Sequence, residues 1–210
     1  MTRKEYRMTF QNTDISATEK PSVMVDLIGL KRALEATIKA VQKKTTVPIL
    51  ANVLIKGHGD MVTITGTDLD IEIIRTLPAA ADSRFNITVQ AHKLLDLLKK
   101  APKCDFVSLT QIEGEQEDDC PAVNVEFEKV NYTLNAIDHM DFPSLQGPEN
   151  HHSIAFDAEW LLDTFEALKG AISTEETRYY LNGVFMCAEP DNLSLIACDG
   201  HRLYKQDCPL

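Results

Sequence analysis

Residues that could carry out chemistry are concentrated in the segment LIACDGHRLYK, residues 195–205. Cys198, Asp199, His201 and Arg202 fall within five positions, and thiol, carboxylate and imidazole groups bind metals and transfer protons. A zinc site requires three or four ligands, however, and Cys198 and His201 supply two. A Cys–His nucleophile pair is the alternative, but the sequence marks neither an oxyanion hole nor an orienting residue. The segment therefore favours recognition over catalysis or metal binding.

The other residue types of this segment suit the binding of a peptide or an anion. A glycine such as Gly200 lets a ligand approach the backbone, and the planar guanidinium of Arg202 binds flat or anionic groups. We expect Leu181 and Leu203 to place apolar side chains on neighbouring strands. A solvated surface turn is the alternative interpretation of the same residues.

Composition restricts the class of protein. Of the 210 residues, 44% are hydrophobic and 25% are charged, as in ordinary soluble globular proteins. The five cysteines are odd in number and form no C-x-x-C pair, which argues against a disulfide framework and for a reducing compartment. Without a long apolar run or an apolar secretory segment, the chain is expected to be cytoplasmic. The net charge of −11 alone argues against a groove binder of DNA.

The elements that position this segment belong to an internal repeat. Residues 49–73 and 180–204 align without a gap at a constant offset of 131 positions, which places Asp68 on Asp199. Because apolar positions match along this whole span, the two segments are predicted to fold alike. A weaker third copy lies between them and begins near Phe85.

Each copy is predicted to contain a strand, an amphipathic helix and then further strands. Alternating apolar residues predict opening strands at residues 23–27 and 153–157. Apolar residues at helical spacing predict helices over residues 30–44, 92–103 and 157–170. The acidic run at residues 113–119 is predicted to be a solvated hairpin loop, because clustered carboxylates repel one another.

The chain is thus predicted to consist of successive β-α-β-β-β units in an α+β fold. Two units, with their helices on one face of curved antiparallel sheets, are expected to form a domain over residues 22–147. Residues 1–21 are expected to be a disordered extension, and residues 143–152 a linker. The third unit, within residues 148–210, has no partner unit, so we expect the first half of an incomplete second domain.

The repeat also separates structural residues from special ones. Asp199 has a counterpart in Asp68, which predicts a shared Asx-type turn at the end of a strand. The tripeptide Gly-His-Arg at residues 200–202 faces Leu-Asp-Ile at residues 69–71. Because these positions differ completely, we expect that the fold does not require Gly-His-Arg and that the tripeptide serves the third unit alone.

Several motifs resemble those of the bacterial sliding clamp family, the β subunit of DNA polymerase III. They are TRYYLNGV and DGHRLY in the third unit, VPILANVLI and TGTDLDIEI in the first, and DFPSL at the end of the first domain. The resemblance runs from about Val23 to Leu210. It implies a DNA-clamp fold and a processivity factor that encircles duplex DNA and tethers the replicative polymerase. No catalysis, cofactor or metal is implied.

The resemblance also implies partners and site residues. The partners are duplex DNA bound without sequence preference, the polymerase III alpha subunit, the clamp loader delta subunit, other proteins with a clamp-binding motif, and a second copy of the chain. Positions that line the family's peptide groove match Leu181, Cys198, Gly200, His201, Arg202 and Leu203. Positions that contact DNA in the family match Lys44, His92, Glu175, Tyr179 and Tyr180.

This chain departs from the family at some of these positions. The family often has Thr at Cys198, and Arg, Arg and Gln at Lys44, His92 and Glu175. His92 is mostly uncharged at neutral pH, and Glu175 reverses the sign of its contact.

Charge is distributed unevenly over the three predicted helices. The first and second are basic, which suits non-specific attraction to phosphates, although ordinary solvated helix faces are the alternative. The third is acidic. The basic residues are Lys31, Arg32, Lys39, Lys43 and Lys44 in the first helix and Lys93, Lys99, Lys100 and Lys103 in the second.

Three functions are compatible with these features. The first is a sliding clamp or its N-terminal part. The second is a shortened clamp homologue that binds clamp-binding peptides, or regulates, without encircling DNA. The third is an unrelated enzyme that uses Cys198 and His201. Because the second half of domain two and all of domain three are missing from the resemblance, we expect no standard ring from this chain alone. The unpaired third unit instead predicts a two-fold homodimer through these units.

Overall fold

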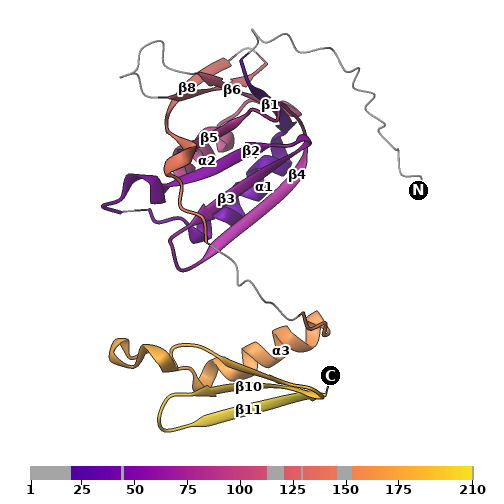
Figure 1. Ribbon diagram of the computed structural model, residues 1–210, viewed down its shortest axis with the longest axis vertical. Coiled ribbons are helices and arrows are strands. Elements are labelled where there is room, and N and C mark those ends of the chain that lie inside the picture. Colours follow the sequence, from indigo (N-terminus) through magenta and orange to yellow (C-terminus); the bar gives the residue numbers. More distant parts are fainter. Residues whose placement is uncertain (1–19, 44, 113–120, 129, 146–152, 210) are drawn as a thin grey trace, which may run out of the picture. The chain divides into compact units, whose positions relative to one another are not determined.

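The computed structural model describes residues 20–43, 45–112, 121–128, 130–145 and 153–209 (Figure 1). Contacts divide the chain into two units, Met1–Gln146 and Gly147–Leu210. Lys44, the acidic run with its predicted hairpin loop, residues 1–19 of the expected extension and residues 146–152 of the expected linker lie outside the described residues.

Within the described part of the first unit, eight antiparallel strands form a closed barrel in the order β1-β4-β3-β2-β5-β8-β7-β6. Its first half contains β1 (Ser22–Asp26), α1 (Leu27–Thr37), β2 (Asn52–Gly57), β3 (Gly59–Thr67) and β4 (Glu72–Ala81). Its second half contains β5 (Asn86–Gln90), α2 (Ala91–Lys99), β6 (Phe106–Ile112), β7 (Ala122–Phe127) and β8 (Val130–Ile137). Short 3-10 turns lie at Ile38–Ala40, Pro48–Ala51 and His139–Asp141.

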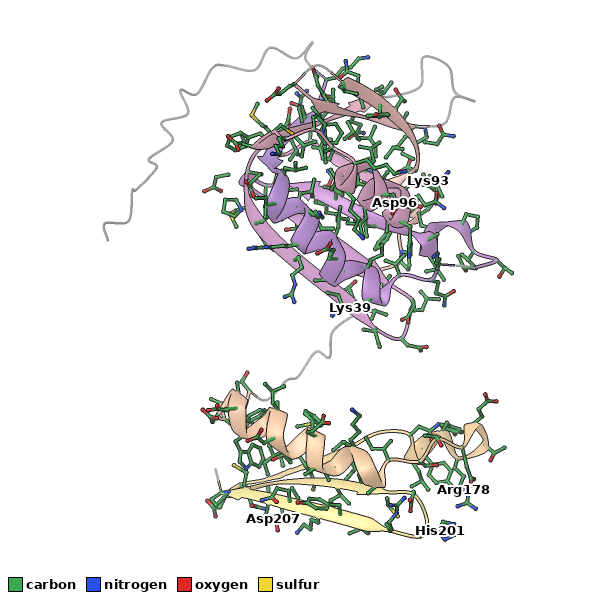
Figure 2. All side chains as sticks on the ribbon, turned by 180° about the vertical axis from the view of Figure 1, so that it is seen from behind. Lys39, Lys93, Asp96, Arg178, His201 and Asp207 are labelled. Carbon is green, nitrogen blue, oxygen red and sulfur yellow. The ribbon has the colours of Figure 1, made fainter. Side chains whose placement is uncertain are left out.

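Both helices of this unit lie on the same side of the strands, as Figures 1 and 2 show from opposite directions. α1 packs against α2. The residues at helical spacing face the core, since burial is confined to Leu30, Ala33, Leu34 and Thr37 in α1 and to Ala91, Leu94, Leu95 and Leu98 in α2. The predicted α+β arrangement is therefore observed. None of the described helices is both long and apolar enough to span a membrane.

The first two helices are shorter than the sequence predicted. α1 ends at Thr37 because Val41 leaves the helical region in an extended conformation and is itself buried in the core. α2 ends at Lys99, ahead of Pro102, since a proline disfavours helical dihedral angles at the residue before it. Lys43 and Lys103 therefore follow the helices instead of belonging to them.

The described part of the second unit contains one helix against a three-stranded sheet in the order β11-β10-β9. Leu168, Leu193 and Leu195 form its small core together with two alanines. Figure 1 shows α3 along one face of this sheet. The elements are α3 (Ala158–Leu168), 3-10 turns at Lys169–Ala171 and Glu176–Leu181, β9 (Phe185–Glu189), β10 (Asn192–Cys198) and β11 (Leu203–Pro209).

The strand predicted at residues 153–157 is wrong, because this segment pairs with no strand among the described residues. Its last residue, Asp157, has extended dihedral angles and caps α3. The counterpart of the segment in the first unit, β1, is held by two neighbours, with three residue pairs to β4 and five to β6. A strand needs such partners for its backbone groups, and the described second unit contains no counterpart of β6.

The internal repeat is confirmed by the structure. The offset of 131 positions carries α1 onto α3 and carries the 3-10 turn after α1 onto the turn after α3. Asp26 and Asp157 cap the two helices by accepting a hydrogen bond from the backbone N–H three residues on, at 2.5 and 2.9 Å. The register of β2 on β3 recurs in β9 on β10, and that of β3 on β4 recurs in β10 on β11.

The predicted Asx-type turn is confirmed in both copies. Oδ1 of Asp199 accepts hydrogen bonds from the backbone N–H groups two and three residues on, at 2.9 and 2.7 Å. Oδ1 of Asp68 accepts the equivalent pair at 3.1 and 2.8 Å. One carboxylate therefore satisfies two backbone donors where each hairpin reverses.

The fold does not require glycine itself at the first of residues 200–202, since Leu69 stands there in the other copy, but it does require a particular backbone conformation. Gly200 has φ of 88°, and its counterpart Leu69 has φ of 81°, so the turn requires a positive φ in both units. A guanidinium nitrogen of Arg178 also lies 2.7 Å from the place where a Cβ of residue 200 would stand. Glycine is therefore favoured at 200 by the positive φ of the turn, whereas the flexible guanidinium of Arg178 can move away from an added Cβ.

We predict that Leu69→Gly is more stable than Leu69→Ala by about 1 kcal/mol, because only glycine relieves the left-handed strain. The alanine variant is the matched control, since it removes the same half-exposed side chain and keeps a Cβ at positive φ. Urea unfolding of the first unit, followed by far-ultraviolet circular dichroism, measures the difference. Equal midpoints for the two variants would contradict the assignment of strain to Leu69.

We predict that Gly200→Ala destabilises the second unit by about 1–2 kcal/mol, because alanine is strained at the positive φ of this turn. The chain has one tryptophan, and Trp160 packs against the core of this unit, so its fluorescence reports unfolding there. Arg178→Ala provides a control background, because it removes the guanidinium near the added Cβ and leaves the backbone strain. Mutation of Gly200 should cost similar stability in both backgrounds, and an unchanged midpoint for Gly200→Ala alone would refute the preference for glycine.

Candidate functional site

A groove of about 520 Å³ lies in the second unit between the 3-10 turn at residues 176–181 and the sheet. Leu181 and Cys198 belong to its walls, as the sequence predicted. Leu181 lies in the 3-10 turn, however, and not on a strand as expected. Further side chains that line the groove include those of Tyr179, Tyr180, Phe185 and Ile196.

The remaining predicted groove residues lie beside this hollow, at the reversal from β10 to β11. Gly200, His201 and Arg202 form the exposed turn itself. Leu203 begins β11, pairs with Cys198 across the sheet and is 67% exposed. The structure thus brings all six residues to one end of the sheet.

Apolar side chains on this side of the sheet extend the surface beyond the predicted set. Ile196 pairs with Phe185, and Cys198 pairs with Leu203, so these side chains share the face opposite to the buried Leu195. Sequence reasoning missed Phe185 and Ile196 as surface residues. The alternation of Ile196 with Leu195 and Ala197, which are both buried in β10, was the available signal, whereas β9 contains no buried residue.

Asp199 fixes the shape of the turn and the direction of Arg202. Besides the two backbone hydrogen bonds, the carboxylate accepts a hydrogen bond from Nε of Arg202 to its Oδ2 atom at 3.1 Å. The same Oδ2 atom lies 3.0 Å from Nη2 of Arg202. These groups, the backbone N–H of Arg202 first and that of His201 second, lower the pKa of Asp199 to about 2. At neutral pH the carboxylate is ionised and holds the guanidinium, whose side chain remains 73% exposed.

Cys198 serves the turn through its sulfur atom. Sγ accepts a hydrogen bond from the backbone N–H of Gly200 at 3.3 Å. In the first unit, Oγ1 of Thr67 accepts the equivalent bond from Leu69 at 3.0 Å. A threonine is therefore structurally equivalent at this position, and the thiol acts here as a hydrogen-bond acceptor.

The geometry does not assemble the alternative catalytic or metal site. Among the described residues no hydrogen bond joins the side chains of Cys198 and His201. Nor does this part of the chain contain a cluster of three or more His, Cys, Asp or Glu side chains placed to hold a metal ion. What the turn offers instead is a set of exposed donors and apolar groups for recognition.

Arg178 connects the 3-10 turn to the reversal at Gly200. Its Nε lies 3.2 Å from Oε2 of Glu175, and its guanidinium reaches over Gly200. Figure 2 shows Arg178 and His201 at the same end of the second unit. The pair with Arg178 offsets part of the negative charge that Glu175 introduces among the residues predicted to contact DNA.

The predicted DNA contacts fall into both units. Tyr179 and Tyr180 are 79% and 72% exposed, with ring centroids 5.8 Å apart in an edge-to-face arrangement. They share the 3-10 turn with Leu181, so the two predicted sets meet there. His92 lies in the first turn of α2 in the other unit and is half-buried, while Lys44 is outside the described residues.

A second groove, of about 700 Å³, lies in the first unit near the N-terminus of α2. Lys43 and Lys93 line it together with the amide side chains of Asn52, Gln90 and Asn135. Figure 2 shows Lys39 and Lys93 on the side of the barrel that carries the helices. This side can attract phosphate groups through exposed lysines, with hydrogen-bonding amides nearby.

Comparison with known proteins agrees with both units. Residues 22–146 match the family described as DNA polymerase III beta subunit, N-terminal domain. The chain is 33% identical over 189 residues to the beta sliding clamp of Caulobacter vibrioides. The alignment covers 88% of this chain and 50% of that protein. It is 30% identical over 182 residues to the beta sliding clamp of Bacillus subtilis, covering 83% of this chain and 46% of the other.

Solved structures give the same result. The beta sliding clamp of Caulobacter crescentus matches with a TM-score of 0.81 at 33% identity, over 91% of this chain and 51% of that one. The DNA polymerase sliding clamp of Bacillus subtilis matches with a TM-score of 0.80 at 28% identity, over the same shares of the two chains. The chain spans about half the length of these relatives. With both its N-terminal domain and its groove-bearing unit matched, this chain belongs to the bacterial beta sliding clamp family.

Proposed function

We propose that the chain is a non-catalytic sliding-clamp subunit that holds a DNA polymerase on duplex DNA through a peptide-binding groove. The observation that carries the proposal is the groove of the second unit, where apolar side chains stand exposed beside a turn held rigid by Asp199. The partners are those implied by the family: duplex DNA, the polymerase alpha subunit, the clamp loader delta subunit and other proteins with a short clamp-binding motif.

The groove suits a short apolar peptide with one polar anchor. Leu181, Ile196 and Leu203 offer apolar surface on which one or two peptide side chains can be buried, and each fully buried side chain contributes about 1.5–3 kcal/mol before ordering costs. Arg202 offers donors that point along a direction set by Asp199. Because Asp199 already orders this side chain, a peptide loses less conformational entropy of the protein on binding.

Non-specific DNA contact is proposed for the helix-bearing side of the first unit. Lys43 and Lys93 flank its groove, and Arg32, Lys39 and Lys99 are exposed on or next to the helices. The net charge of −11 opposes approach at long range. We therefore expect weak binding that depends steeply on salt.

A second candidate is a clamp homologue that binds peptides without encircling DNA. It is supported by the charge of the second unit, where Glu159, Asp163 and Glu166 are exposed on α3 and Lys169 pairs with Glu166 at 3.5 Å. Glu175 adds a further carboxylate near the tyrosines. These charges disfavour phosphate contact in the second unit and leave the groove intact.

We predict that Leu203→Ala weakens binding of a fluorescent apolar clamp-binding peptide about tenfold, because it removes apolar surface at the edge of the groove. Fluorescence anisotropy measures the affinity. Ile71→Ala is the matched control, since Ile71 is an exposed apolar residue of the equivalent turn in the first unit. Equal affinities for wild type and Leu203→Ala would place the peptide site elsewhere.

We predict that Lys93→Gln weakens binding to a fluorescent duplex at low salt and lowers the slope of log affinity against log salt by about 1, as one phosphate contact is lost. Lys169→Gln is the control, because Lys169 is exposed in the 3-10 turn that directly follows the acidic helix. Its affinity and slope should equal those of wild type. A wild-type chain with no detectable affinity for duplex at low salt would favour the second candidate function.

A further inference from the structure

A third groove, of about 480 Å³, lies on the outside of the first barrel, where β1, β6 and β7 are neighbours. Met24 of β1 and Phe106 of β6 form its apolar walls and are 50% and 42% exposed. Both side chains stand on one face of the sheet, because Met24 pairs with Ser108 and Phe106 lies two residues before Ser108. Apolar side chains therefore face solvent beside a hollow, in a barrel whose described strands already form a closed ring.

The charged side chains that line this groove are all carboxylates, namely those of Asp105, Glu126 and Glu128. All three residues are exposed, and no ion pair joins any of them to a basic side chain in the described part of the chain. Burial, followed by the charges of Glu128 and Asp105, raises the pKa of the Cys104 thiol, which also lines the groove. The negative potential therefore reaches into the hollow, and the groove suits an occupant with both cationic and apolar side chains.

The N-terminal segment of the same chain has this chemistry. Residues 1–10 read MTRKEYRMTF and contain three basic residues against one carboxylate, in a chain whose net charge is −11. Large apolar or aromatic residues alternate with the basic ones at Tyr6, Met8 and Phe10. The segment is thus complementary to the groove in charge and in apolar character.

The segment is also attached close to the groove. Residues 11–21 join it to β1, which contributes Met24 to the groove wall. Ser22 lies opposite Thr110 and Asp26 opposite Phe106, so the groove ends roughly 13 Å along β1 from the point where the chain enters the strand. Eleven residues can span up to about 36 Å, so the segment can turn back to the groove. A short tether gives a local concentration on the order of millimolar, at which weak contacts are sufficient.

We propose that residues 3–10 bind in this groove of their own chain. Basic side chains of the segment pair with the carboxylates of Asp105, Glu126 and Glu128, and an apolar side chain packs between Met24 and Phe106. The contact covers the apolar walls and offsets the clustered negative charge. Because the charges are exposed, binding weakens as salt rises. It is independent of whether the chain binds DNA or a peptide.

Cys104 provides a native reporter for this contact in the full-length chain. Gln11→Cys places a thiol next to Phe10, and mild oxidation should join it to Cys104 within one chain. The reaction is run at pH 9, because the raised pKa of the Cys104 thiol slows its reaction at neutral pH. Nonreducing digestion and mass spectrometry identify the linked peptides. Cys104→Ser in the same background should remove this link.

Charge reversal separates binding from chance collision of the tethered thiols. In the Gln11→Cys chain, Glu126→Lys with Glu128→Lys should lower the initial rate of cross-linking about tenfold. Reversal of the segment by Arg3→Glu, Lys4→Glu and Arg7→Glu should lower it similarly. Combining both sets should restore most of the rate, because opposite charges again face each other.

Glu35→Lys with Asp70→Lys is the matched control for the groove variant. It makes the same change in net charge at exposed positions, one on α1 and one in the turn between β3 and β4, and neither residue lines the groove. Its cross-linking rate should therefore not fall below that of the Gln11→Cys chain. Circular dichroism establishes that each variant is folded.

Three results would overturn the proposal. Equal rates in the charge-reversed and parent chains would mean that the segment meets Cys104 by collision alone. A cross-link found only between two chains, as a dimer on nonreducing electrophoresis, would assign the groove to a segment of another molecule. If no link to Cys104 forms in a folded chain, the segment does not reach the groove.

Discussion

One β-α-β-β-β unit has more apolar surface than it can bury by itself, and most of this structure depends on that constraint. A curved sheet with a helix on one side leaves the rim of the sheet and one flank of the helix uncovered. In the first barrel a second unit covers both, and residues such as Val23 and Ile55 become fully buried. In the second unit the same positions are apolar and half-exposed. Burial of these side chains, and not local preference, decides which elements are complete.

The same constraint explains why one segment is a strand in the first unit and not in the second. β1 is held mainly by β6, which comes from the neighbouring unit. Residues 153–157 have a similar apolar pattern and a similar helix cap at Asp157, yet they lack that neighbour among the described residues. A β-strand is stabilised by pairing with a neighbouring strand, so two segments with similar apolar patterns can adopt different structures when only one of them has such a neighbour.

The candidate groove is built on a turn that the fold requires for its own reasons. Asp68 and Asp199 close equivalent reversals by satisfying two backbone donors, and the first unit uses this turn with no groove residue attached. In the second unit the turn additionally aims Arg202 and admits Arg178 over Gly200. The proposed binding residues are thus placed on a turn that is held by its own hydrogen bonds, which would keep the surface ordered before a partner binds.

Local chemistry and periodicity were sufficient to predict part of this protein. The gap-free repeat, the capping aspartates and the Asx-type turns involve residues a few positions apart, so their hydrogen bonds follow from the sequence itself. The clustering of residues 198–203 at one reversal was predicted for the same reason. The helix ends were predicted less well, because Val41 leaves α1 to enter a core made by distant strands.

Tertiary structure alone decided the features that depend on distant partners. Closure of the barrel needs β1 to meet β6, and the exposure of Phe185 and Ile196 depends on which strand lies beside β9. The contact of Arg178 with Gly200 joins residues on two separate elements. The preference for glycine at residue 200 became visible only from the positive φ of Gly200 and Leu69, because leucine at the equivalent position gives no sign of it in the sequence. Sequence patterns record which side chains prefer burial and which backbone groups can be capped nearby, whereas pairing between remote segments is settled by the partners that folding brings together.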